Sequence, residues 1–502
     1  MRDLLERLWN PPFHRYLTLA AVAVLLAGLG YWIAVPTPAH KCAPGVTRPK
    51  GATECVGVSA TAYDFGVTPF AATVQAINRE NHRLKSGGYV TVALFEPFTA
   101  GDQDSVDDTL HELQGAYLAQ YQANHNTTGE TPDIRLVLAN TGADGRYWPQ
   151  VADQLIGMVK GPDRLRAVTG IGLSTDNNEA AVKRLTQHGV PVVGSSITAD
   201  SFANGQNGQD TFPGLARVAP TNSDSARALA SFAGFSASSS ILVYDKPGDP
   251  YTQTLQQAFA KLTAGSPYQP QPYTTGPGTP NTFRQITSIL CGTPRTTNTI
   301  LFAGRHVPLR QFINVLGQRG CMDRHFTVLT GDEGSYLTTD TQLDHKALTR
   351  NLTVRYTALA HPDAWKQDKT KTGGSAADAA VLDGLLGQST KQPVGPIGPV
   401  DLQDGQLIIA YDAMRLAVAG IREATSGDQT TPRIADVVNE WSLMKGTQKV
   451  QGASGWICLD AHGNPYDKAV PIVELTPQGG SRFVKIAWPE GKPPSKECLP
   501  PA

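Results

Sequence analysis

Short apolar runs alternate with amphipathic segments along most of the chain from Tyr89 onward. Tyr89–Phe95 is a β-rich apolar run, and Leu110–Ala123 has the periodicity of a helix. The same alternation predicts further strands at 134–139, 167–170, 190–193, 241–244, 299–302 and 326–329, and further helices at 147–160, 177–188, 224–232, 251–262 and 309–318. Strands that alternate with helices of about ten or more residues are typical of parallel sheets with right-handed crossovers. The pattern therefore predicts an α/β protein with two doubly wound lobes, and no obvious linker separates them.

A long apolar segment lies close to the N-terminus. Tyr16–Val35 contains twenty residues without a charge, which as a helix would span a hydrocarbon core of about 30 Å. Arg2, Arg7 and Arg15 precede it, so we expect residues 1–15 to be a cytoplasmic tail and 16–35 a transmembrane anchor. A cleaved signal peptide is the alternative, although no A-x-A site closes the run. The interpretation places the protein in the cell membrane as a single-pass protein with its folded part extracytoplasmic.

The segment 36–88 follows the apolar run and is rich in proline at its start. Prolines at 36, 38, 44 and 49 break regular structure, so we expect an extracytoplasmic tether. Residues 71–85 could form a short helix, but the pattern is also compatible with a plain spacer, which we favour.

Composition narrows the possible partners and the compartment. The 43 lysines and arginines nearly equal the 44 aspartates and glutamates, which gives no electrostatic reason to expect a nucleic-acid partner. An even number of cysteines, six, is suited to a few disulfides in an exported chain. Six cysteines allow fifteen pairings. We predict the three that each close a loop within one neighbourhood: Cys42–Cys55, Cys291–Cys321 and Cys458–Cys498.

The order and wording of several segments resemble the type I periplasmic-binding-protein fold. The most similar group is the branched-chain amino-acid (Leu/Ile/Val) binding proteins of ABC importers. The segments that carry the resemblance lie between Tyr89 and Trp488: 90–95, 167–175 (AVTGIGLST), 189–198 (GVPVVGSSIT), 217–224 (RVAPTNSD), 241–251 (ILVYDKPGDPY), 301–305 (LFAGR), 328–334 (VLTGDEG), 410–421 and 455–463. The resemblance implies two lobes joined by three hinge crossovers. It assigns 89–222 and 352–448 to lobe 1, 223–351 and 449–490 to lobe 2, and 491–502 to a C-terminal tail.

Hydroxyl-rich loops of lobe 1 follow the predicted strands at the edge where ligands bind in open α/β sheets. Ser174 and Thr175 precede a helix start, where free N–H groups and hydroxyls could hold a carboxylate. Ser196 and Thr198 follow the next strand. The resemblance implies that these positions hold the α-carboxylate and α-ammonium of a ligand. The alternative is that they only cap helices.

Lobe 2 contributes three further candidate ligand-binding residues through the resemblance. Tyr251 matches an aromatic residue that closes over the ligand, and Glu333 matches the carboxylate that pairs with an α-ammonium. Arg305 stands where amino-acid binders often carry an aromatic residue, a departure that would suit an anionic or more polar ligand. A solvated turn acid and a surface loop charge are the alternatives for Glu333 and Arg305.

The exit of the first strand also departs from the family, which usually has Ser-Gly-Pro there. Glu96 and Phe98 stand in its place and are possible ligand contacts. Acidic residues follow, at 102, 104, 107 and 108, but they lack the Gly and the distal Glu of a calcium loop. We therefore expect a solvated loop and no metal site.

Signatures of common enzymes are missing: the sequence contains no GxxxxGK[ST], HExxH or GxSxG motif. We expect no catalytic residues and no cofactor. The leading hypothesis is a membrane-anchored solute-binding protein that captures a small polar, amino-acid-like ligand by hinge closure and delivers it to an ABC permease. A ligand-sensing ectodomain and an interaction module that has lost its ligand are the alternatives.

Overall fold

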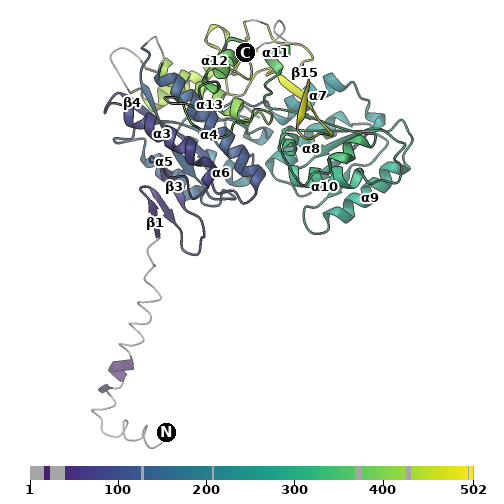
Figure 1. Cartoon of the computed structure of the whole chain (residues 1–502), viewed down its shortest axis with the longest axis horizontal. Coiled ribbons are helices and arrows are strands. Elements are labelled where there is room, and N and C mark those ends of the chain that lie inside the picture. Colours follow the sequence, from purple (N-terminus) through teal and green to yellow (C-terminus); the bar gives the residue numbers. More distant parts are fainter. Residues whose placement is uncertain are drawn as a thin grey trace, which may run out of the picture.

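The computed structural model describes residues 16–17, 19–22, 40–125, 129–205, 208–367, 376–425, 431–495 and 497–500. Figure 1 shows the two lobes side by side, with lobe 1 mainly purple and blue and lobe 2 mainly teal and green. The expected cytoplasmic tail and most of the expected anchor at 16–35 lie outside the described residues. Within the described part of the chain, no helix combines the length and the apolar character needed to cross a bilayer.

Lobe 1 is built on an eight-stranded sheet with the order β1-β2-β3-β5-β4-β6-β7-β8. The five strands from β4 to β8 run parallel, while β3 pairs antiparallel with β5 and continues the sheet outward through β2 and β1. The strands are β1 (His40–Ala43), β2 (Val46–Arg48), β3 (Val56–Ser59), β4 (Tyr89–Glu96), β5 (Asp133–Asn140), β6 (Leu165–Gly170), β7 (Val192–Gly194) and β8 (Leu215–Arg217). Apolar clusters on both faces bury the parallel strands, as a parallel sheet requires.

Helices cover both faces of this sheet. They are α3 (Ala71–Arg83), α4 (Gln103–Asn124), α5 (Trp148–Gly157), α6 (Asp176–Gln187), α12 (Ala376–Leu386), α13 (Gln406–Glu423) and α14 (Ile434–Glu440). The short helix α11 (Ala364–Gln367) lies after the second crossover, and its Ala364 packs with Phe483, Ile486 and Trp488 of lobe 2. The central pair, α4 and α13, approach closely at Gly115, where an added Cβ would come within 2.2 Å of the carbonyl oxygen of Leu407. Only glycine permits this contact, which holds the returning chain against lobe 1.

Lobe 2 has a seven-stranded sheet with the order β10-β9-β11-β12-β13-β14-β15. Its first five strands in that order are parallel and the last two add antiparallel. The strands are β9 (Ser240–Asp245), β10 (Gln271–Tyr273), β11 (Thr299–Ala303), β12 (Phe326–Thr330), β13 (Leu352–Thr357), β14 (Val470–Leu475) and β15 (Ser481–Ala487), and the covering helices are α7 (Asn222–Ala233), α8 (Pro250–Leu262), α9 (Thr279–Gly292) and α10 (His306–Leu316). The α/β prediction with two doubly wound sheets is confirmed.

The chain passes between the lobes three times, at about 218–221, 358–361 and 465–469. Two expected lobe boundaries are wrong. The strand β13 lies in the sheet of lobe 2, so the chain leaves that lobe after Thr357 and not at 351. Residues 449–464 still belong to lobe 1, because the amide of Arg217 donates to the carbonyl of Gly463 at 3.1 Å and Asn464 donates to the carbonyl of Asn204 at 3.0 Å.

The segment 36–88 differs most from its expectation. From His40 it forms β1, β2 and β3 and then α3, all packed on lobe 1. The side chain of Asn81 donates to the carbonyl of Leu136 in β5 at 2.8 Å, which ties α3 to the sheet. The tether interpretation is therefore wrong over the described part of this segment, and residues 71–83 are helical.

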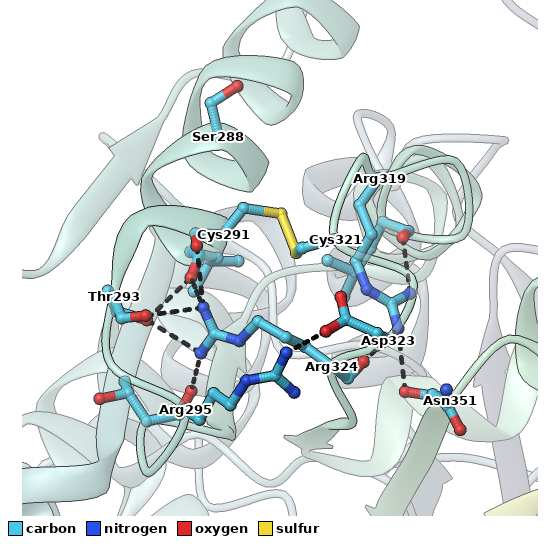
Figure 2. The surroundings of a disulfide bond; sticks show 12 residues. Ser288, Cys291, Thr293, Arg295, Arg319, Cys321, Asp323, Arg324 and Asn351 are labelled. Carbon is cyan, nitrogen blue, oxygen red and sulfur yellow. Dashed lines mark hydrogen bonds and ion pairs between the residues drawn. A yellow bond between two sulfur atoms is a disulfide. The ribbon is translucent and has the colours of Figure 1, made fainter.

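The three predicted disulfides are confirmed, and the part of the chain that the structure describes holds no free cysteine. Cys42–Cys55 joins β1 to the residue that precedes β3, and Cys458–Cys498 fastens the C-terminal segment to lobe 1. Cys291–Cys321 links the end of α9 to the loop after α10, and Figure 2 shows its surroundings.

Arg324 organises the loops beside this disulfide. The residue is 6% exposed. Its guanidinium donates to five main-chain carbonyls at 2.7–3.0 Å, those of Leu290, Cys291, Thr293, Pro294 and Thr297 (Figure 2). The N–H groups of the guanidinium satisfy the last carbonyls of α9. Its positive charge also interacts favourably with the negative end of the helix dipole.

Arg324→Gln is expected to lower the free energy of unfolding by about 2 kcal/mol, because the shorter amide leaves buried carbonyls without donors. Urea denaturation followed by circular dichroism measures the change. Arg295→Gln is the matched control, since Arg295 pairs with Asp323 on the exposed side of the same loops (Figure 2). An equal loss in both variants would show that the buried carbonyl contacts carry no special weight.

Candidate functional site

The carboxyl ends of three neighbouring strands in lobe 1 supply the first half of the candidate site. Glu96 ends β4, Ser174 and Thr175 follow β6, and Ser196 and Thr198 follow β7. The loop after β6 lies close beneath Glu96: the amide of Gly172 donates to its Oε1 at 3.2 Å. A Cβ on Gly170 would meet the same oxygen at 2.3 Å, so this approach requires glycine.

The hydroxyls of the β6 loop hold the lobe 1 loops together. Ser174 Oγ accepts hydrogen bonds from the amides of Thr198 and Ala199, at 3.1 and 3.2 Å. Thr175 caps α6 by accepting from the amide of Asn178 at 3.3 Å. Thr175 is therefore a helix cap, which was the alternative to a ligand contact. Ser174 positions the loop that carries Thr198.

Ser196 contacts an acid that the sequence pattern did not single out. Its Oγ lies 2.8 Å from Glu112 Oε1 and 3.0 Å from the carbonyl oxygen of Gly172. Glu112, on α4, adjoins Glu96, and both are almost fully buried. Burial, followed by the neighbouring Glu112, raises the pKa of Glu96 well above its usual range, and burial also raises the pKa of Glu112. The pair therefore retains a proton at a pH where exposed glutamates are ionised.

Lobe 2 supplies the other half from the ends of β11 and β12 and the start of α8. Arg305 lies at the N-terminal end of α10, and its Nε and Nη2 donate to Asp249 Oδ2 at 2.8 and 2.7 Å. Its Nη1 donates to Glu333. The guanidinium also lies over the ring of Tyr251, 4.6 Å from the centroid, and the hydroxyl of Tyr251 accepts from the amide of Glu333 at 3.3 Å.

Hydrogen bonds at this point join the two lobes. The carbonyl oxygen of Ser174 accepts from Arg305 Nη2 at 2.8 Å and from the amide of Tyr251 at 3.3 Å. Thr198 Oγ1 donates to Asp332 Oδ1 at 3.4 Å. The structure thus brings Ser174, Thr198, Tyr251, Arg305 and Glu333 into one connected cluster.

Glu333 is the most buried charge of the cluster, at 1% exposure. Burial opposes its ionisation, but Arg305 and then His306 outweigh that cost and lower the pKa of Glu333 to about 2. His306 contributes its amide and its Nδ1, which lie 2.9 and 2.8 Å from Glu333 Oε2. Beside it, burial and the charge of Glu333 raise the pKa of Asp332 to about 7.

The charge pairing differs from the picture that the sequence suggested. We expected Arg305 and Glu333 each to face a ligand, but the two side chains pair with each other. Asp249 and His306 complete the network, and neither was a candidate. In the described structure the charged groups of the cluster therefore pair with one another.

Two expectations for the segment that follows β4 are wrong, because the residues concerned are buried. The ring of Phe98 is fully buried in the core of lobe 1, 5.2 Å from the ring of Phe65 and 5.7 Å from that of Phe70, so it is not placed to touch a ligand. The acidic stretch is not a solvated loop, because α4 begins at Gln103 and Asp108 is 8% exposed.

No protein-family model matches the sequence, and no curated protein matches it. Solved structures match at low identity. The branched-chain amino acid substrate-binding protein LivJ from Streptococcus pneumoniae, in complex with isoleucine, aligns with a TM-score of 0.56 at 16% identity over 79% of this chain and 99% of its own. The leucine-binding protein LivK from Thermotoga maritima aligns with a TM-score of 0.56 at 16% identity, over 80% of this chain and 99% of its own.

This chain has the type I periplasmic-binding-protein fold. A solute-binding protein of an ABC transporter from R. palustris, in complex with benzoate, shows the same similarity, with a TM-score of 0.56 at 14% identity over 82% of this chain and 99% of its own. The fold expected from the sequence resemblance is therefore confirmed, and the cluster lies where strand ends of both lobes meet.

Proposed function

We propose that this chain is an extracytoplasmic solute-binding protein that holds a small polar, amino-acid-like ligand between its lobes. The observation that carries the proposal is the junction itself, where Ser174 and Thr198 of lobe 1 bond directly to Arg305, Tyr251 and Asp332 of lobe 2. A ligand that contacts both lobes at once would stabilise their closed arrangement. The neighbours of this fold that are bound to isoleucine and to benzoate support a ligand of this size.

The charges of the junction favour a zwitterion. A ligand ammonium would compete for Glu333, and a ligand carboxylate would compete for Arg305. A molecule that carries both charges can insert between Arg305 and Glu333 and replace their mutual ion pair without leaving either charge buried alone. A ligand with only one of the two charges breaks this ion pair but compensates only one of its members, which leaves Arg305 with Asp249 alone or Glu333 with His306 alone.

Delivery to an ABC permease and anchoring by the segment 16–35 complete the proposal. The anchor would keep the binding lobes beside a transporter in the same membrane. The descriptions of the neighbours as ABC transporter proteins support the transport role. No step of this proposal requires a catalytic residue or a cofactor.

A thermal-shift screen of the full chain in detergent tests ligand binding. Each free amino acid is compared with its N-acetyl derivative, which lacks the ammonium charge, and with its amide derivative, which lacks the carboxylate charge. We expect one group of free amino acids to raise Tm, because a ligand at 100 times its Kd adds about 2.7 kcal/mol of stability, and both derivatives to fail. Equal shifts by the free and blocked forms would contradict recognition through Arg305 and Glu333.

An interaction module without a ligand is the second candidate. The observation that favours it is that Arg305, Asp249, Glu333 and His306 already satisfy one another's charges. This candidate predicts no Tm shift with any amino acid or small anion in the same screen.

A further inference from the structure

Two carboxylates of lobe 1 face a histidine of lobe 2, beside the cluster described above. Asp102 and Asp104 lie at the start of α4, and His306 is the first residue of α10. One oxygen of each aspartate and one ring nitrogen of His306 all lie within 4.8 Å of one another. These three residues are called the interlobe triad below.

The ring of His306 is held in a fixed orientation. Its Nδ1 lies 2.8 Å from Glu333 Oε2, and the ring stacks on Tyr336 with centroids 4.4 Å apart. His306 is 8% exposed, yet its Nε2 has no hydrogen-bond partner among the described residues. Burying a polar atom without a hydrogen-bond partner is energetically unfavourable, so a ligand bound to this nitrogen would stabilise the site.

We propose that the interlobe triad binds a divalent transition-metal cation of the zinc type. Imidazole and carboxylates are ordinary zinc ligands, and a carboxylate on the second ring nitrogen is the usual support of a metal-binding histidine, a role that Glu333 fills. Tetrahedral coordination would bring the ligand atoms to roughly 3.3 Å of one another, inside the 4.8 Å within which they lie here. Calcium and magnesium prefer oxygen ligands, so the imidazole selects against them.

The neighbouring charges are compatible with a cation. Arg310, on the same face of α10, is bound to Asp340 at 2.9 Å, so its charge is already balanced. Asp102 also caps α4: its Oδ1 accepts from the amide of Ser105 and its Oδ2 from the Ser105 hydroxyl, both at 2.9 Å. Each carboxylate oxygen retains a further lone pair for a cation. Because the ligands come from different lobes, bound metal would hold the lobes together independently of any solute.

Zinc titration of the chelator-stripped full chain in detergent tests this site. Competition against a colorimetric zinc chelator is expected to show one high-affinity zinc per chain, and Co²⁺ is expected to give a visible absorption band. The Asp102→Asn/Asp104→Asn double variant is expected to bind zinc at least tenfold more weakly and to lose the cobalt band. Asparagine caps a helix as well as aspartate, so this variant keeps α4. Zinc is also expected to raise the Tm of the wild type and not that of the double variant.

Matched controls separate the triad from incidental binding. Asp107→Asn removes a neighbouring acid of the same helix, and His462→Gln removes an exposed histidine that pairs with Asp210 at 2.8 Å. Both are expected to bind zinc as the wild type does, while His306→Gln loses the site. Equal zinc affinity in the wild type and the double aspartate variant would overturn the proposal, as would equal affinity for calcium.

Discussion

Arg305→Met is expected to destabilise the chain by about 3–5 kcal/mol and to loosen the contact between the lobes. The substitution leaves Glu333 buried with only His306 to pair with it, and it removes both donors to Asp249 Oδ2. Breaking a buried ion pair by removing one partner has an effect of this size, because the remaining charge loses its compensation. The hydrogen bond to the carbonyl of Ser174, which crosses between the lobes, is lost as well.

Urea denaturation measures the stability change, and small-angle scattering measures the separation of the lobes. Arg184→Met is the matched control: Arg184 also donates through Nε and Nη2 to one aspartate, Asp153, but on an exposed surface. It is expected to change stability by less than about 1 kcal/mol. The double variant Arg305→Met/Glu333→Gln is expected to recover part of the loss, because it also removes the stranded charge. If Arg305→Met behaves like the control, the network does not hold the lobes together.

The alternation of strands and helices in the sequence was sufficient to predict most of the fold. Strands such as Tyr89–Glu96 have apolar residues at nearly every position, because both faces of a parallel sheet are covered. The disulfides could be predicted because each closes a loop of 13 to 40 residues within one neighbourhood. The resemblance placed the strand ends that form the junction.

The short strands β1 to β3 could not be predicted in the same way. They are three or four residues long, too short for a clear alternation, and Pro44 and Pro49 flank them. They are strands because β3 pairs with β5, and that pairing is tertiary. The same limit explains the misplaced boundary at 351, since membership of β13 in a sheet depends on its partner β12.

The charge network was hidden from the sequence for a related reason. Arg305 lies 56 positions from Asp249 and 28 from Glu333, so no local spacing connects them. Glu112 has helical neighbours only, and nothing in its segment shows that its face of α4 meets Ser196. One signal was available: Asp249 precedes Pro250 at a helix start and therefore predicts a helix cap.

Glu333→Gln is expected to destabilise the chain in a way that depends on pH, by at most about 3 kcal/mol. Arg305 and His306 outweigh burial and lower the pKa of Glu333 from 4.5 to about 2. A carboxylate with a lowered folded-state pKa adds stability that is fully present above its unfolded pKa and is lost as the pH falls through about 2. The difference between wild type and variant should therefore grow from pH 2 to about pH 5.

Above pH 5, Asp332 and His306 reduce the difference in stability between the wild type and Glu333→Gln. The charge of Glu333 helps, after burial, to raise the pKa of Asp332 to about 7, so in the wild type ionised Asp332 becomes a cost as the pH rises toward 7. Burial alone would lower the pKa of His306, but its hydrogen bond and ion pair with Glu333 raise that pKa. The stability contributed by protonated His306 is therefore lost as the pH rises through this raised pKa. Without the charge of Glu333, the variant keeps only the part of the first effect that burial causes, and it loses the contribution of Glu333 to the second. Urea denaturation at pH 3, 5 and 8 should thus show the largest loss near pH 5, and a loss that increases steadily up to pH 8 would contradict this account of the buried network.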